Sequence, residues 1–237
     1  MSNFKKKHTA GAYVRDVHLA YLIKGARRTK GEGYPIIEGW MIAKHPPEDI
    51  FQWDKRNEVT DPANTAMSFY CNDVGFTPIL NNPQKYVEKL KKYQCVIGLD
   101  ASPYDNMPPV VQKSQIFCNL AVTYYFGTQG IKVVPNVRLG SEETLDSLDA
   151  YPKHHLIAIG TNGFTWSLAN RVIFKNQVDL VVKELAPSGI LVYGPASDYI
   201  FEYAKQQGVQ IYQYDSFTMK RNMQRKVLSK ERDKGER

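Results

Sequence analysis

The chain has 237 residues, of which 43% are hydrophobic, 12% aromatic and 23% charged. This composition excludes a fibrous or wholly disordered protein and suffices for a substantial core. No apolar run reaches the roughly 18 residues that a membrane helix needs, and the basic start lacks the apolar stretch of a secretory signal. We therefore expect a cytoplasmic protein without membrane contact.

The three cysteines, Cys71, Cys95 and Cys118, form no CxxC pair and have no histidine at metal-ligand spacing. An odd and sparse set of this kind predicts reduced thiols in a reducing compartment. Cys95 and Cys118 lie within apolar or amphipathic runs, which predicts that both are small core residues.

The net charge of +7 is concentrated at the two ends of the chain. Residues 1–65 carry eleven Lys and Arg against eight Asp and Glu, residues 66–216 twelve against thirteen, and residues 217–237 eight against three. Basic ends on a neutral body favour a polyanionic partner, and DNA is favoured over RNA. The alternative is a solvated tail that only improves solubility.

Residues 1–65 lack a regular alternation of strands and helices. Residues 12–23 have helical spacing, residues 24–35 resemble an exposed basic arm, and residues 36–43 predict an edge strand or a core plug. Two prolines and two acids open residues 46–53, which predicts a turn of helix. We interpret residues 1–65 as an extension that packs on a domain at 66–217, with a basic tail at 218–237.

From residue 66 onward, short runs rich in Val, Ile and Tyr alternate with amphipathic segments. The predicted strands are residues 66–71, 95–99, 131–137, 155–159, 190–193 and 209–214. The predicted helices are residues 83–93, 109–127, 141–151, 171–185 and 197–207. Such alternation predicts an α/β fold with about six parallel strands, as an incomplete TIM-barrel-like arrangement or an open doubly wound sheet. Polar residues follow nearly every strand, which favours the barrel-like arrangement with a site at the carboxyl rim.

Four blocks of sequence carry a resemblance to a known family. They are FYCNDVGFTPILNNPQKYVEKLKKYQCVIGLDASPYDNMP, QGIKVVPNVRLGSEETL, IAIGTNG and ILVYGPASDYIFEYAKQQGVQIYQYDSF. In order and spacing these blocks resemble DUF4417, a domain of unknown function found in bacteria and phages, over residues 69–217. The resemblance implies a protein of a phage, plasmid or mobile element, and it implies no reaction.

Residues 100–105 are the strongest candidate for chemistry. Asp100 ends a strand, and Ser, Tyr and a second carboxylate, Asp105, follow on a proline-bounded loop. Carboxylates converging from different strands hold metals or act as acid and base, and Asp73 and Asp215 are expected on the same rim. The alternative is an Asx-type turn that caps the next helix.

Asn136 and Arg138 stand at the end of the next strand. Arginine is the preferred fork for phosphate or carboxylate, so Arg138 is a candidate anion anchor. The alternative is an ion pair with Asp100 or Glu142. The candidate catalytic residues are Asp73, Asp100, Asp105, Asn136 and Arg138.

Other motifs carry less information. Residues 160–163 (GTNG) fit a phosphate-binding loop or, more simply, a turn. His154 and His155 precede a strand at its amino end, which argues against a metal role. The sequence has no Walker, GxGxxG, HExxH, GxSxG or EF-hand pattern, so it identifies neither a cofactor nor a metal.

Residues 217–228 predict a short basic amphipathic helix, because Met219, Met223 and Val227 recur at steps of four. The candidate nucleic-acid-binding residues are Arg27, Arg28, Lys30, Lys220, Arg221, Arg225 and Lys226.

Three functions remain open. The favoured one is a nucleic-acid-associated protein of a phage or mobile element, in DNA replication or processing, that holds phosphates with its basic ends. The alternatives are an enzyme with a carboxylate and arginine site at the strand rim, or a factor that binds a host or phage protein.

Overall fold

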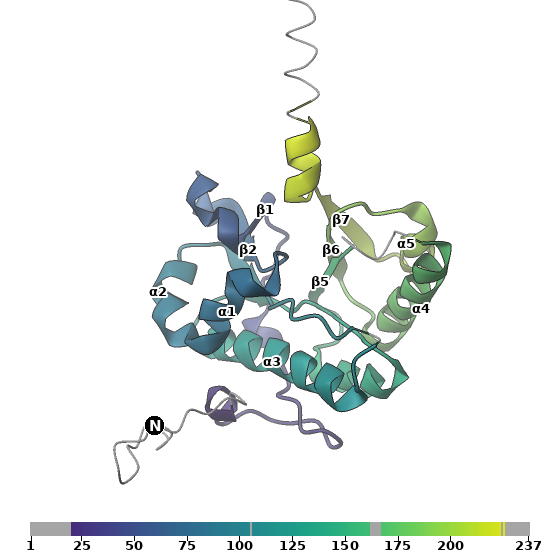
Figure 1. Cartoon of the computed structure of the whole chain (residues 1–237), viewed down its shortest axis with the longest axis horizontal. Helices are drawn as coiled ribbons and strands as arrows, with labels where there is room; N and C mark the ends of the chain where they lie inside the picture. Colours follow the sequence, from purple (N-terminus) through teal and green to yellow (C-terminus); the bar gives the residue numbers. More distant parts are fainter. Residues whose placement is uncertain (1–19, 105, 162–166, 224, 226–237) are drawn as a thin grey trace, which may run out of the picture.

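Within the described residues, seven parallel strands form two sheets in this computed structural model (Figure 1). The structure describes residues 20–104, 106–161, 167–223 and 225. The first sheet has the order β1-β2-β3-β4 and the second the order β5-β6-β7. The strands are β1 (Asp49–Gln52), β2 (Thr65–Ser68), β3 (Cys95–Ile97), β4 (Val133–Val134), β5 (Leu156–Gly160), β6 (Gly189–Tyr193) and β7 (Gln210–Tyr214).

The two sheets meet at an isolated parallel bridge between Asn136 and Ala158. There Val137 donates its N–H to the Ala158 carbonyl, and Ala158 donates to the Pro135 carbonyl, both at 2.9 Å. The strands therefore follow one another in chain order across both sheets. No β7–β1 pairing is present among the described residues, so the fold is a parallel α/β architecture without a closed barrel.

Helices connect successive strands and cover the outside of the sheets (Figure 1). The α-helices are α1 (Asp73–Asn81), α2 (Val87–Leu90), α3 (Pro109–Thr128), α4 (Leu168–Leu185) and α5 (Asp198–Gln206). The 3-10 helices are η1 (Ala20–Ile23), η2 (Gly39–Met41), η3 (Trp53–Glu58), η4 (Pro62–Asn64), η5 (Pro83–Tyr86) and η6 (Glu142–Ala150). Residues 217–223 form a further helix after β7, called here the C-terminal helix. None of the helices in the described part of the chain combines the length and the apolar character of a membrane span.

The core lies between the strands and these helices. Every residue of β2, β5 and β6 is buried, because both faces of each strand are covered. Parallel strands covered on both faces read as continuous apolar runs, and this pattern made them recognisable in the sequence. Residues 36–43 act as a core plug, since Ile37, Met41 and Ile42 are all buried.

All six predicted strands are present, but the prediction of a helical turn at residues 46–53 is wrong. Residues Asp49–Gln52 form β1, which pairs in parallel with β2, for example Ile50 with Ala66. The nine-residue helix α1 was not predicted, although Asn72 caps it by accepting from the N–H of Val74 at 3.1 Å. Within the predicted helix at residues 141–151, Glu142–Ala150 form a 3-10 helix, not an α-helix.

Candidate functional site

The carboxyl ends of the parallel strands share one rim, and polar side chains meet there. Asp100 follows β3, and Asn136 and Arg138 follow β4. The structure brings these three predicted residues into direct contact. They lie deep in the rim, since the side chains of Arg138 and Asp100 are only 11% and 10% exposed.

Arg138 makes the ion pair with Asp100 that was weighed as the alternative to an anion anchor. Its Nε donates to Oδ1 of Asp100 at 2.5 Å and its Nη2 donates to Oδ2 at 2.9 Å. Asn136 donates its Nδ2 to the same Oδ1 at 2.7 Å. Burial alone would lower the pKa of Arg138, but the Asp100 carboxylate outweighs it and the pKa is raised. Both charges are therefore held in place, as a buried pair requires.

Two tyrosines that the sequence did not single out complete this network. Tyr70 donates its hydroxyl to Oδ1 of Asn136 at 2.9 Å, and its ring stacks on Tyr193 with centroids 4.9 Å apart. Burial raises the pKa of Tyr70 well above its ordinary value, so the phenol stays protonated and donates. Gly160 lies against the Tyr70 ring, where an added Cβ would approach Cε1 to 2.7 Å. In the sequence these tyrosines read as ordinary strand residues.

The remaining predicted acids are placed differently. Asp73 begins α1, and its pKa is raised by burial and by the nearby charge of Asp100. Asp215 follows β7 on the same rim and is half-buried. Asp105 lies outside the described residues. The described part of the chain holds no group of three His, Cys, Asp or Glu side chains suited to a metal ion.

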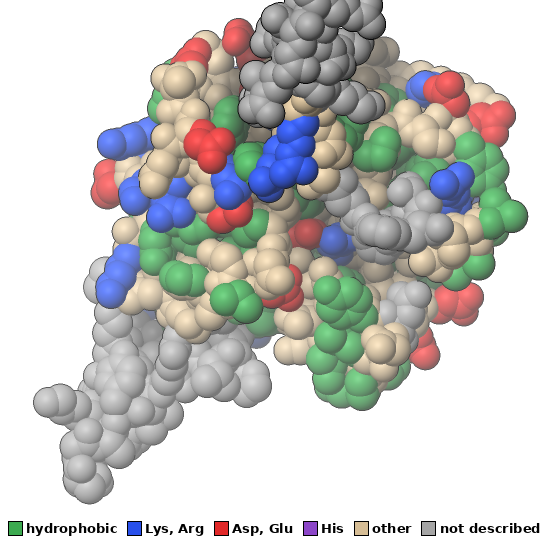
Figure 2. Space-filling view, turned by 45° about the horizontal axis from the view of Figure 1, so that its top comes forward, with side chains coloured by type: hydrophobic (Ala, Val, Ile, Leu, Met, Phe, Trp, Pro, Cys, Tyr) green, Lys and Arg blue, Asp and Glu red, His purple; other side chains and the backbone are tan. Residues whose placement is uncertain are grey.

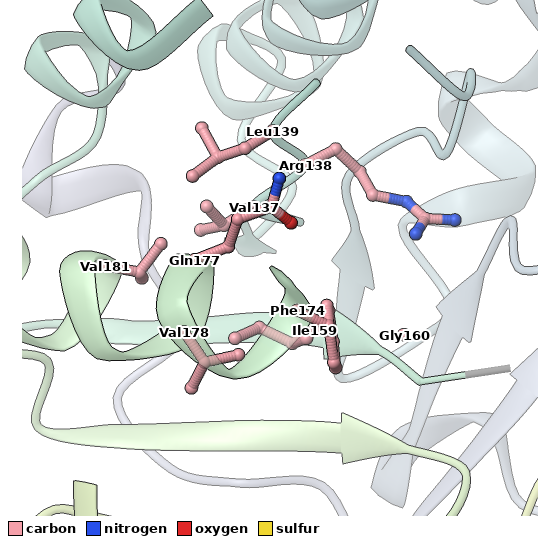
Figure 3. Close-up of a pocket in the computed structure, with 9 residues that line it drawn as sticks. All are labelled: Val137, Arg138, Leu139, Ile159, Gly160, Phe174, Gln177, Val178 and Val181. Atoms are coloured by element: carbon pink, nitrogen blue, oxygen red, sulfur yellow. The ribbon is translucent and has the colours of Figure 1, made fainter. Parts of the chain in front are cut away.

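A small cavity lies between the two sheets and α4, beside the network (Figure 3). It measures about 20 Å³, room for about one water. Figure 3 shows the guanidinium of Arg138 extending away from the apolar lining side chains. At the end of β5, Thr161 donates its N–H to the Tyr193 carbonyl at 3.1 Å, so that N–H is occupied; residues 162 and 163 of the GTNG motif lie outside the described residues.

The segment at residues 24–35 and the C-terminal helix lie on opposite sides of the molecule (Figure 1). Figure 1 shows the described N-terminal residues at the bottom and the C-terminal helix at the top. Arg27 is ion-paired with Glu38, with bonds of 2.8 and 2.9 Å, while Arg28 and Lys30 are exposed. Lys220 is half-buried and Arg221 and Arg225 are exposed, whereas Lys226 lies outside the described residues. The structure therefore does not join the predicted nucleic-acid-binding residues into one surface.

A larger basic surface surrounds the C-terminal helix. We define the basic face by the cations of η3, η5, α2 and that helix: Lys55, Arg56, Lys85, Lys89, Lys220 and Arg221. Figure 2 shows Lys and Arg side chains gathered on this side of the molecule, with acidic side chains between them. The four cations before residue 90 were not predicted. The segment of Lys55 and Arg56 has as many acids as cations, while residues 83–93 carry four lysines against one acid, a signal that the net charges of the chain's ends did not reveal.

Aromatic rings hold several cations of the basic face. Lys55 lies 4.7 Å from the ring centroid of Phe217, and Lys220 lies 4.6 Å from that of Phe51. Arg56 and Lys89 lie 4.5 and 5.9 Å from the ring of Trp53. Lys220 also contacts both carboxylate oxygens of Asp49, at 2.6 and 2.7 Å. These contacts join the C-terminal helix to β1 and η3.

Comparison with known proteins gives one relative and no fold match. The chain is 23% identical over 130 residues to the Gene 1 protein of Mycobacterium phage L5. The match covers 54% of this chain and 57% of the phage protein, so it spans little more than half of either. No solved structure matches.

The family resemblance is confirmed over a longer stretch than the sequence blocks indicated. The model of the domain of unknown function DUF4417 matches residues 37–215, which include η2 and β1 as well as the strands that follow. The match covers about three quarters of the sequence. The chain belongs to the DUF4417 family.

Proposed function

We propose that this protein is a nucleic-acid-associated protein of a phage or mobile element, and that it binds phosphates through the basic face. The observation that carries the proposal is the set of cations held over aromatic rings around β1, η3 and the C-terminal helix. A side chain that is already ordered loses less entropy when it binds a phosphate. Cation–π contact keeps the positive charge available, because the ring carries no net charge.

Acidic side chains beside the basic face limit its affinity for phosphate. Asp49 contacts Lys220, and Asp54 lies 3.7 Å from Lys55. These pairs are partly exposed, so they are weak and screened by salt. A phosphate can therefore displace the carboxylate from either lysine. We expect moderate affinity with a marked dependence on salt.

The N-terminal cations are assigned a lesser role in this proposal. Arg27 is ion-paired with Glu38, and the segment at residues 24–35 lies on the far side of the molecule from the C-terminal helix (Figure 1). The phage origin of the Gene 1 relative supports the proposed setting.

An enzyme centred on Asp100 is not the favoured function. Arg138 bonds both of its carboxylate oxygens and Asn136 bonds Oδ1 as well, so the described contacts of Asp100 are those of a structural partner. A host-protein-binding factor stays open, and it becomes the favoured function if nucleic acid does not bind.

The test is fluorescence-anisotropy titration of labelled DNA and RNA with the full chain, over about 50 to 200 mM salt. The variant combines Lys85→Ala, Lys89→Ala and Arg221→Ala, three exposed cations of the basic face. The control combines Lys24→Ala, Arg28→Ala and Lys30→Ala, exposed cations near the other end of the molecule. Both triple variants lose the same net charge.

The basic-face variant should bind more weakly, with a log–log salt slope shallower by about 2 to 3. The control should stay within about threefold of the unmodified protein. Equal losses in both variants would contradict a localised binding face. An absence of binding at the lowest salt would overturn the proposal altogether.

A further inference from the structure

An exposed tyrosine stands on the same rim as the basic face. Tyr104, in the loop after β3, is 56% exposed, so its ring is accessible to a ligand. Its loop is fixed by the side chain of Asn119, which accepts from the Ala101 N–H and donates to the Ala101 carbonyl, both at 2.9 Å. The backbone carbonyl of Tyr104 accepts from the N–H of Met107, also at 2.9 Å. The ring is thus presented on an ordered backbone.

The position of Tyr104 follows from the parallel sheet. Lys55 and Arg56 follow β1, and Tyr104 follows β3, so all three leave carboxyl ends of strands at one rim. β1 and β3 both flank β2 in the first sheet, so the segments that follow them leave the sheet at the same edge.

Tyr104 belongs to the loop that begins at the buried network. Asp100, which pairs with Arg138, follows β3, and Tyr104 comes a few residues later in the same loop. The exposed ring is therefore carried by a segment whose start is anchored by the ion pair.

We propose that the rim binds unpaired nucleic acid, with phosphates on the basic face and a base stacked on Tyr104. This inference rests on the proposed function and narrows its substrate to single strands. Every base has a π-face, so stacking on an aromatic side chain is sequence-tolerant, and it requires a base that is free of a duplex. Proteins that bind single strands without sequence preference combine a positively charged groove with aromatic side chains on which the bases stack.

The experiment compares a labelled single strand of about 20 nucleotides, the duplex of the same sequence and an abasic strand of equal length. The variants are Tyr104→Ala and Tyr104→Phe. The control is Trp40→Ala, since Trp40 is 61% exposed and its carbonyl accepts from Lys132, which precedes β4 at the opposite rim. Thermal unfolding of each variant verifies the fold.

Tyr104→Ala should weaken binding of the single strand about 5- to 150-fold, the range typical of one stacked base, and leave duplex and abasic binding unchanged. Tyr104→Phe and Trp40→Ala should retain affinity, because the former keeps the ring and the latter lies elsewhere. Unchanged single-strand affinity in Tyr104→Ala, or an equal loss for all three probes, overturns the stacking inference while the basic face stands. Absence of binding by the unmodified protein overturns both.

Discussion

Arg138 and Asp100 form a two-bond fork between the ends of two neighbouring strands, with Nε to Oδ1 at 2.5 Å and Nη2 to Oδ2 at 2.9 Å. β4 has only two residues, so the ladder between β3 and β4 is short. These two side-chain hydrogen bonds connect the two segments beyond the point where the backbone hydrogen bonds between β3 and β4 end. The bond from Asn136 to Asp100 and the bridge from Asn136 to Ala158 extend it to the second sheet.

Removing the charge of Asp100 should therefore destabilise the protein. Asp100→Asn keeps the shape of the side chain but leaves the buried Arg138 without its anion, which typically costs about 3 to 5 kcal/mol. Urea unfolding measures the loss as a lower transition midpoint. Asp198→Asn is the control, because its pair with Lys205 is exposed and its midpoint should hardly change. An unchanged midpoint in Asp100→Asn would show that the carboxylate is not structural and would revive its catalytic assignment.

The pH dependence of stability should report on Asp73. Burial, and then the charge of Asp100, raise the pKa of Asp73 above its ordinary value of 3.8, so the folded protein holds this proton more tightly than the unfolded chain does. Ionised Asp73 therefore reduces stability above its folded pKa, and this cost disappears below about pH 4. As the pH falls through the folded pKa of Asp73, the free energy of unfolding of the unmodified protein should rise relative to that of Asp73→Asn.

Asp198→Asn supplies a control of opposite sign. A hydrogen bond and the charge of Lys205 lower the pKa of Asp198, so its contribution is lost as the pH falls through its folded pKa. Unfolding free energies measured from about pH 7 down to about pH 2 test both variants, since the folded pKa of Asp198 lies below 3.8. A difference between Asp73→Asn and the unmodified protein that stays constant with pH would contradict the raised pKa.

Gly160→Ala should destabilise the rim. The added methyl would lie 2.7 Å from Cε1 of Tyr70, a ring that is stacked on Tyr193 and bonded to Asn136, so it has little room to move. Overpacking of this kind costs about 1 to 3 kcal/mol. Gly31→Ala is the matched control, since its Cβ would meet only Asp146 at an ordinary 3.5 Å. Equal melting temperatures for the two variants would contradict the close packing.

The sequence predicted the elements that depend on local pattern. Fully buried strands such as β5 and β6 are continuous apolar runs, and their carboxyl ends had to share a rim, so the meeting of Asp100, Asn136 and Arg138 followed. β1 could not be predicted in this way. Half of its four residues are polar, and it is a strand because it pairs with β2.

The basic face depended on contacts between distant segments. Lys55 and Phe217 come from opposite ends of the chain, and their contact is set by the position of the C-terminal helix across the gap between β7 and β1. The stacking of Tyr70 on Tyr193 could not be predicted either. Tyr70 follows β2 and Tyr193 ends β6, positions where buried aromatic residues are common. Charge counts along the sequence also could not show that residues 24–35 lie on the opposite side of the molecule from the C-terminal helix.

The charge of Asp49 should weaken the binding of nucleic acid to the basic face. Both of its carboxylate oxygens contact Lys220, and Oδ1 also accepts from the N–H of Ile50 at 2.7 Å. Asp49→Asn keeps an oxygen for that N–H while removing the charge that competes with phosphate. We expect tighter binding and a salt slope steeper by about 0.7 to 0.9, as for one additional released counterion. Anisotropy titrations against Asp198→Asn, which removes the same charge at the exposed start of α5, separate a local effect from a change in net charge. Equal gains in the two variants would indicate that only net charge matters, and weaker binding by Asp49→Asn would show that the ion pair holds the C-terminal helix in its binding position.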